Sequence, residues 1–179
     1  EANGIDNEPH VKDKLATLVI YATMCRAAGE AAMLNARQTE DGVLTPSPLF
    51  VSALKYYRSE FTAKLLDILH DIAGTLTVNA PTFADYENPD LHESLDAALG
   101  TSSFTAEQRL RLFHYLRDTT ADAYGGWSYV TGQLAGGGQH AQRLVTMRQY
   151  DMERAKELAR RSIGLDGGEA AQEAIQTCA

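Results

Sequence analysis

The residues best placed to contact a ligand lie in the stretch Asp-Ile-Ala-Gly-Thr, residues 71–75. Gly74 lacks a Cβ, so the backbone there can come close to a phosphate group. A glycine at this position is also the commonest residue after the last turn of an ordinary helix. The stretch therefore indicates either a phosphate contact or a simple helix end, and the rest of the chain must decide between them.

Aromatic and acidic side chains further along form a second set of candidates. Trp127 and Tyr129 are of the kind that lines ligand pockets, although a helical core uses aromatic residues as well. Asp118 and Asp122 resemble a pair of acid–base carboxylates, but a solvated helix face is the simpler interpretation. The run of glycines at 136–138 indicates either a hinge or a flexible corner before the next helix.

The common catalytic motifs are missing from the sequence. It contains no HExxH, CxxC, GxSxG or phosphate-loop lysine motif, and no GxGxxG after a strand. The histidines lack the helical spacing of metal ligands, so no metal site is expected. His70 is interpreted as a cation that faces the C-terminal end of a helix. We therefore expect no catalytic residue in this chain and no self-sufficient active site.

The net charge, the apolar runs and the cysteines of the chain limit which kinds of partner it can bind. The chain has 179 residues, enough for one domain with a real core, and a formal net charge of −8. The spread of Lys and Arg among acids argues against nucleic acid and against anionic membranes. No apolar run is long enough to span a bilayer. Cys25 and Cys178 fit neither a disulfide framework nor a metal site, so a cytoplasmic protein is expected.

Apolar residues that recur every three or four positions predict four long helices. Pro9 follows a helix-start signal, Thr45 can cap the second helix, and Thr105 with Gln108 forms a capping box. The four helices are expected over about residues 9–37, 46–73, 106 to beyond 118, and 139–163.

The fold class that follows is all-α, a four-helix up-and-down bundle. A shorter helix is expected near residues 91–99, and strand signals are limited to residues 76–78. Residues 9–165 form the predicted bundle domain, and residues 1–8 are interpreted as a linker from a missing upstream region. Residues 166–179 are expected to be a flexible tail.

Three segments together resemble the C-terminal helical domain of a flavoprotein family. They are HVKDKL at residues 10–15, HDIAGTLTVNAPT at 70–82, and AQRLVTMRQYDMERAKELARRSIG at 141–164. This family comprises the 4-hydroxyphenylacetate 3-hydroxylases and the related 4-hydroxybutyryl-CoA dehydratase, and the resemblance covers about residues 9–165. It implies a bundle like the C-terminal domain of acyl-CoA dehydrogenases, which belongs to a longer chain, contacts FAD and forms a homotetramer or dimer.

The resemblance assigns the flavin contact to the opening stretch. Asp71, Ile72, Ala73 and Gly74 match the family's Asp-Ile-Ala-Gly-Gly segment, and Thr75 replaces its second glycine. These five residues are the implied FAD-binding residues, often toward the flavin of a neighbouring subunit. The hydroxyl of Thr75 can still donate a hydrogen bond to a phosphate oxygen.

The two branches of the family imply different chemistry. The dehydratase needs an iron–sulfur cluster and a carboxylate base a few residues before the glycine-rich corner. At the position of that base this sequence has Thr131, and a hydroxyl cannot replace a carboxylate base. The monooxygenase takes reduced FAD from a separate flavin reductase and hydroxylates a small aromatic substrate, whose pocket Trp127 and Tyr129 would line.

We therefore expect the FAD-contacting and oligomerising C-terminal domain of a 4-hydroxyphenylacetate 3-hydroxylase-like monooxygenase, inactive as an isolated piece. Two alternatives stay open. One is the C-terminal domain of a 4-hydroxybutyryl-CoA dehydratase/vinylacetyl-CoA isomerase-like enzyme. The other is a non-catalytic helical assembly domain.

Overall fold

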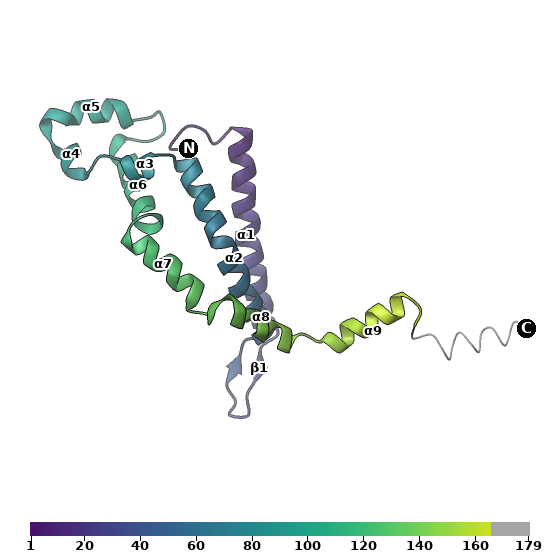
Figure 1. The fold of residues 1–179 in the computed structure, drawn as a ribbon. Helices are drawn as coiled ribbons and strands as arrows, with labels where there is room; N and C mark the ends of the chain where they lie inside the picture. The colour runs from purple at the N-terminus through teal and green to yellow at the C-terminus, as the bar shows by residue number, and fades with distance from the viewer. Residues whose placement is uncertain (166–179) are drawn as a thin grey trace, which may run out of the picture.

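A computed structural model describes residues 1–165 of the chain, which are mostly helical (Figure 1). The predicted tail, residues 166–179, lies outside the described residues. Two long helices, α1 (Pro9–Leu34) and α2 (Pro48–Ala73), run antiparallel side by side. An aromatic stack joins them, in which the ring centroids of Tyr21 and Tyr57 are 5.4 Å apart. The expected all-α class is confirmed.

A short hairpin connects α1 to α2, and the sequence analysis did not predict it. Its strands are β1 (Arg37–Gln38) and β2 (Leu44–Thr45), with Arg37 opposite Thr45. The first helix therefore ends before Arg37, and Thr45 belongs to a strand instead of capping the second helix. Ser47 is the residue before α2, and its N–H donates to the Ala32 carbonyl at 2.9 Å. This contact fixes the start of α2 against the end of α1.

Three small helices follow α2, namely α3 (Leu76–Asn79), α4 (Phe83–Glu87) and α5 (Pro89–Leu99). The helix predicted near residues 91–99 is confirmed, whereas the strand signal at residues 76–78 is wrong because these residues form α3. The N–H groups of Thr77 and Val78 donate to the carbonyls of Gly74 and Thr75, and Thr77 is buried. Tertiary burial thus outweighs the β preference of this short segment.

The second half of the chain contains α6 (Ala106–Thr120), α7 (Ala123–Leu134), α8 (Gly138–Gln149) and α9 (Met152–Ser162). The predicted capping box before α6 is confirmed, because the Thr105 hydroxyl accepts from the Gln108 N–H at 3.2 Å and the Gln108 side chain accepts from the Thr105 N–H at 2.9 Å. A core of Leu99, Ala106 and Leu110 holds α6 to α5.

Each of the two helices predicted in this half, from residue 106 and from residue 139, is divided in two in the structure. Asp122 starts α7 anew by accepting a hydrogen bond from the Ala123 N–H at 2.7 Å. Asp151 does the same for α9 by accepting from the Arg154 N–H at 2.9 Å. The helix α9 then projects away from the other helices (Figure 1). Leu158 of α9 is 66% exposed because no described element covers it.

None of the helices in residues 1–165 is both long enough and apolar enough to cross a membrane.

Candidate functional site

The predicted ligand contact is the turn at the C-terminal end of α2. Gly74 has φ 71° and ψ −164°, a backbone conformation that is essentially limited to glycine. Its N–H donates to the His70 carbonyl at 2.7 Å, which ends the helix. A Cβ added to Gly74 would meet no atom within 4 Å, so the backbone is open to approach from outside. The residue therefore serves as a helix end and also leaves room for a ligand.

A buried arginine, Arg109, stabilises this turn through Asn3, and neither residue was predicted from the sequence. The Asn3 side-chain amide donates to the carbonyls of Ile72 at 3.0 Å and Ala73 at 3.3 Å. The Arg109 guanidinium donates to the Asn3 side-chain oxygen at 2.9 Å and to the Leu99 carbonyl at 2.6 Å. Arg109 is only 8% exposed. The N-terminal segment is thereby fixed against the last carbonyls of α2.

The remaining polar groups of the turn contact neighbouring helices. Asp71 forms an ion pair with Lys14 of α1. The hydrogen bond from Lys14 and its positive charge lower the pKa of Asp71. His70 lies in the last turn of α2 as predicted, and its Nε2 is 2.8 Å from the Thr120 hydroxyl of α6. Asp71 and His70 therefore stabilise the position of the turn, whereas Gly74 and Thr75 are exposed.

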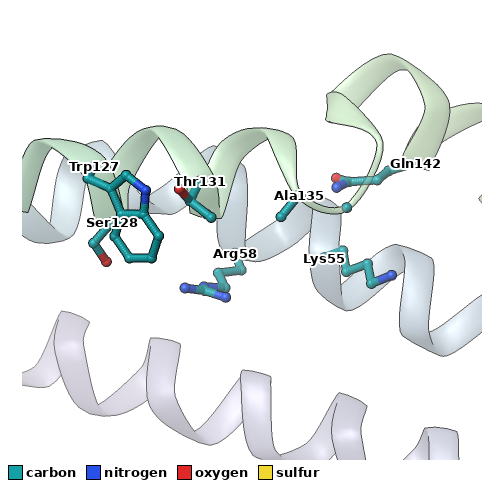
Figure 2. A pocket seen from close by; sticks show the side chains of 9 residues that line it. Lys55, Arg58, Trp127, Ser128, Thr131, Ala135 and Gln142 are labelled. Atoms are coloured by element: carbon teal, nitrogen blue, oxygen red, sulfur yellow. The ribbon is translucent and has the colours of Figure 1, made fainter.

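A pocket of about 300 Å³ lies between α2, α7 and α8 (Figure 2). Trp127 and Thr131 both line it. Tyr129 is half-buried and is not among the lining residues, because two helical positions place it about 200° round the helix from Trp127. The lining residues are Lys55, Arg58, Trp127, Ser128, Thr131, Gly132, Ala135, Gly136 and Gln142.

The pocket is cationic, and within residues 1–165 no carboxylate lines it. Lys55 and Arg58 lie one turn apart on α2 and face α7 (Figure 2). Two glycines, Gly132 in α7 and Gly136 just after it, make room for these long side chains. A Cβ on Gly132 would lie 3.4 Å from the Arg58 guanidinium, and one on Gly136 would lie 3.2 Å from Cδ of Lys55.

The structure keeps the two predicted sites apart. Arg58 precedes Gly74 by sixteen residues along the same helix, which corresponds to about 24 Å at a rise of about 1.5 Å per residue. A small ligand in the pocket therefore does not touch the turn. Asp118 and Asp122 lie elsewhere, exposed and each with an oxygen within 4.0 Å of Arg117, which supports the interpretation of a solvated helix face. Across residues 1–165, no group of three His, Cys, Asp or Glu side chains is arranged to hold a metal.

The glycine-rich corner after α7 contains two residues with positive φ. Gly137 and Gly138 have φ of 92° and 73°, a region that favours glycine. Gly136 packs so closely that an added Cβ would lie 2.5 Å from Nε2 of Gln142. The corner is therefore a tightly packed connection that places α8 against α2.

Comparison with known proteins identifies the family. A family model described as "HpaB: 4-hydroxyphenylacetate 3-hydroxylase C terminal" matches residues 1–164. The chain belongs to this family. The HpaB-family domain is shared by 4-hydroxyphenylacetate hydroxylases and 4-hydroxybutyryl-CoA dehydratase, so the resemblance noted in the sequence is confirmed.

The relatives of this HpaB-family chain divide between two activities. It is 27% identical over 94% of its length to the oxygenase component of a 4-nitrophenol 4-monooxygenase/4-nitrocatechol 2-monooxygenase from Rhodococcus opacus. It is also 27% identical over 91% of its length to a 4-hydroxybutyryl-CoA dehydratase/vinylacetyl-CoA-Delta-isomerase from Clostridium aminobutyricum. The chain spans about a third of these relatives, 33% and 35% respectively.

Solved structures show the same fold. An HpaB oxygenase component complexed with FAD and 4-hydroxyphenylacetate matches with a TM-score of 0.83 and 22% identity, over 93% of this chain and 35% of that one. An archaeal 4-hydroxybutyryl-CoA dehydratase from N. maritimus matches with a TM-score of 0.81 and 24% identity, over 92% of this chain and 33% of that one.

Proposed function

We propose that this chain is the FAD-contacting and oligomerising C-terminal domain of a flavin-dependent aromatic monooxygenase. The observation that carries the proposal is the exposed turn at Gly74, whose glycine-only backbone leaves open space where a Cβ would stand. Related oxygenase components with the same fold are complexed with FAD. The residues Asp71, Ile72, Ala73, Gly74 and Thr75 are the proposed flavin contact.

The residues of the turn fit a phosphate-bearing cofactor in two respects. Close approach to the backbone is open at Gly74, and the exposed Thr75 hydroxyl can donate to a phosphate oxygen. When bound, reduced FAD supplied by a separate reductase would provide the chemistry that activates oxygen. The chain itself would bind the cofactor, hold the turn in place through Asn3 and Arg109, and wall off part of the active site from water.

The pocket favours the monooxygenase branch over the dehydratase. Proton abstraction by a dehydratase needs a carboxylate, and the pocket around Thr131 has none among its lining residues. The aromatic side chain of Trp127 suits a small aromatic substrate instead. The equal identity to the Clostridium dehydratase keeps that activity as the second candidate.

Exposed apolar residues support the oligomerising role. Val19, Ile20 and Met24 of α1 are each more than half exposed, and Leu158 of α9 is 66% exposed. Large apolar side chains that are exposed in this way mark interaction sites. In a homotetramer or dimer, such residues would be buried between subunits or against the rest of the complete protein. A non-catalytic assembly domain would need the same surface, so only flavin binding separates the two functions.

The test uses the complete gene product that contains this chain. FAD binding is measured by quenching of flavin fluorescence for the wild type and for Thr75→Val, which keeps the side-chain volume and removes the hydroxyl. Loss of one charge-assisted hydrogen bond should weaken FAD binding by about tenfold or more. Thr23→Val, which removes an exposed hydroxyl that donates to the Val19 carbonyl on α1, is the control.

Three results would count against the proposal. Equal FAD affinity in Thr75→Val and in the wild type would remove Thr75 from the contact. Absence of FAD binding in the complete protein would favour the assembly domain. An iron–sulfur absorption shoulder at about 400 nm would favour the dehydratase, whereas hydroxylation of a phenol with reduced FAD and oxygen supports the monooxygenase.

A further inference from the structure

We propose that two copies of this protein associate through opposite ends of the fold, so that a groove beside α9 of one copy receives the acidic helices α4 and α5 of the other. The inference rests on the proposed function, because it assigns a surface to its oligomerising role. Three features of residues 1–165 support it: an uncovered helix face, a separation of charge, and the position of the two ends.

The first feature is the apolar face of α9. The apolar residues of this helix lie within about 120° of one another, at about 100° per residue; they are Met152, Ala155, Leu158 and Ala159. A groove of about 700 Å³ runs along part of this face and borders Leu49 at the start of α2. Leu158 lines the groove and is 66% exposed. An amphipathic helix normally buries its apolar face, so a further element is needed to cover this one.

The second feature is the separation of charge along the chain. Residues 65–108 contain eight acidic residues and neither Lys nor Arg, and five of these acids lie in α4 and α5. Residues 138–165, which include α8 and α9, contain six Lys and Arg residues and three acids. Two copies can therefore attract each other through these segments although the net charge of the chain is −8.

The groove itself is lined by cations. Arg37 of the hairpin and Arg154 of α9 border it, and Asp151 is the one acid among its lining residues within residues 1–165. This acid is already engaged, because it accepts a hydrogen bond from the Arg154 N–H. Leu49 and Leu158 supply apolar surface beside the arginines. The groove therefore suits a helix that carries both carboxylates and an exposed apolar side chain.

The outer side of α5 has both properties. Leu91 is 42% exposed, and the neighbouring acids Asp90 and Glu93 are exposed as well. The inner side of α5 is held in the fold, because Leu95 and Leu99 pack in the core that joins this helix to α6. A second copy can therefore contact the outer side of α5 without disturbing this core.

The position of the two ends explains why the contact joins different copies. Helix α5 lies at one end of the described chain, and α9 projects from the opposite end (Figure 1). The acidic helices therefore cannot reach the groove of the same copy. Because the two surfaces differ and each copy supplies one of each, the contact is made twice in a two-fold dimer, or once per subunit in a ring.

The test reverses the charges on each side of the contact. Sedimentation equilibrium of the complete gene product measures the dissociation constant of self-association, at one ionic strength for all samples. One variant reverses the cations of the groove, Arg37→Glu/Arg154→Glu. A second reverses two acids of α4 and α5, Glu87→Lys/Glu93→Lys. All four residues are exposed, so the substitutions leave the packed core unchanged.

Two further samples separate a direct contact from a general loss of stability. A combined variant with all four reversals again has opposite charges across the contact, and so does an equimolar mixture of the two double variants. The matched control for the loss of positive charge is Lys12→Glu/Lys64→Glu, since both lysines are exposed and lie outside the groove. Far-ultraviolet circular dichroism checks the helix content of every variant.

Each double variant should raise the dissociation constant by about tenfold or more, because like charges then face each other across the contact. The combined variant and the mixture should return it to within about threefold of the wild-type value. The lysine control should leave it unchanged. Added salt should weaken the association of the wild type, since the attracting charges are exposed.

An unchanged dissociation constant in either double variant would overturn the proposal, as would a wild type that does not associate. A combined variant that fails to regain association would overturn it as well. Loss of association in the Arg37→Glu/Arg154→Glu variant alone would assign the groove to another part of the complete protein, which contradicts α4 and α5 as its occupant. FAD binding is measured separately, so intact charge-dependent association without FAD binding contradicts only the proposed flavin role.

Discussion

Two adjacent glycines at the start of α7 allow a sharp test of the packing that places the pocket wall. Gly125 is buried, and an added Cβ would lie 2.7 Å from the backbone nitrogen and carbonyl carbon of Thr120. A Cβ on Gly126 would meet no atom within 4 Å. Ordinary carbon contacts lie at about 3.5–4.0 Å, so Gly125→Ala must move α7 away from α6 by about 1 Å.

The expected magnitude follows from two terms. Replacing glycine by alanine in a helix stabilises it by about 0.5–1 kcal/mol, and this term applies to both variants. Forcing extra volume into a packed position costs about 1–3 kcal/mol, and this term applies only to Gly125→Ala. The difference in unfolding free energy between the two variants therefore isolates the steric cost, about 1–3 kcal/mol. It should appear as a melting temperature lower by about 2–12 °C in Gly125→Ala than in Gly126→Ala.

Urea unfolding monitored by far-ultraviolet circular dichroism measures the difference, with Trp127 fluorescence as a second probe two residues from the substitution. Coincidence of the two curves checks that unfolding is two-state. Gly126→Ala should be at least as stable as the wild type. Equal stability of the two alanine variants would refute the close packing of α7 on the end of α6.

Two further predictions concern the turn. Asn3→Ala should lower the free energy of unfolding by about 1–3 kcal/mol in urea denaturation, because buried Arg109 loses a hydrogen-bond acceptor and the α2 carbonyls lose a donor. The control Asn7→Ala, in the same segment, should stay within about 0.5 kcal/mol of the wild type. Equal destabilisation by the two substitutions would contradict the contact. Since Lys14 lowers the pKa of Asp71, the ion pair stabilises the fold above the unfolded pKa of about 3.9, and this stabilisation is lost as pH falls through the lower folded value. Between about pH 6 and pH 2, the melting temperature should therefore fall less steeply for Asp71→Asn than for the wild type. The control Asp67→Asn should keep the wild-type slope. The same slope of melting temperature against pH in all three proteins would show that the ion pair contributes nothing.

Local signals were sufficient for much of the fold. The capping box of Thr105 and Gln108 and the glycine at position 74 act within a few residues, so the start of α6 and the end of α2 could be predicted from the sequence. The breaks at Asp122 and Asp151 had a signal of the same kind, since each aspartate precedes a new helix that it caps. They were missed because the apolar periodicity continues across both positions.

The candidate sites depend on contacts that no local pattern encodes. Asn3 and Arg109 are 106 residues apart, and Ser59 and Gln142 are 83 apart, so neither pair could be found from spacing. No motif in the local sequence marks Lys55 or Arg58 as pocket residues. Only the packing of α7 and α8 against α2 turns them into one end of a pocket.

The hydrogen bonds of Asn3 link two events that are otherwise separate. Docking of the N-terminal segment and the shape of the turn at Ile72 and Ala73 form one equilibrium, because the same amide bridges them. Consider a ligand that binds the turn only when the N-terminal segment is docked. Binding of this ligand must raise the docking equilibrium constant by the same factor by which docking raises the ligand affinity. Residues far upstream of the turn in sequence can thus set the affinity at Gly74 without touching the ligand.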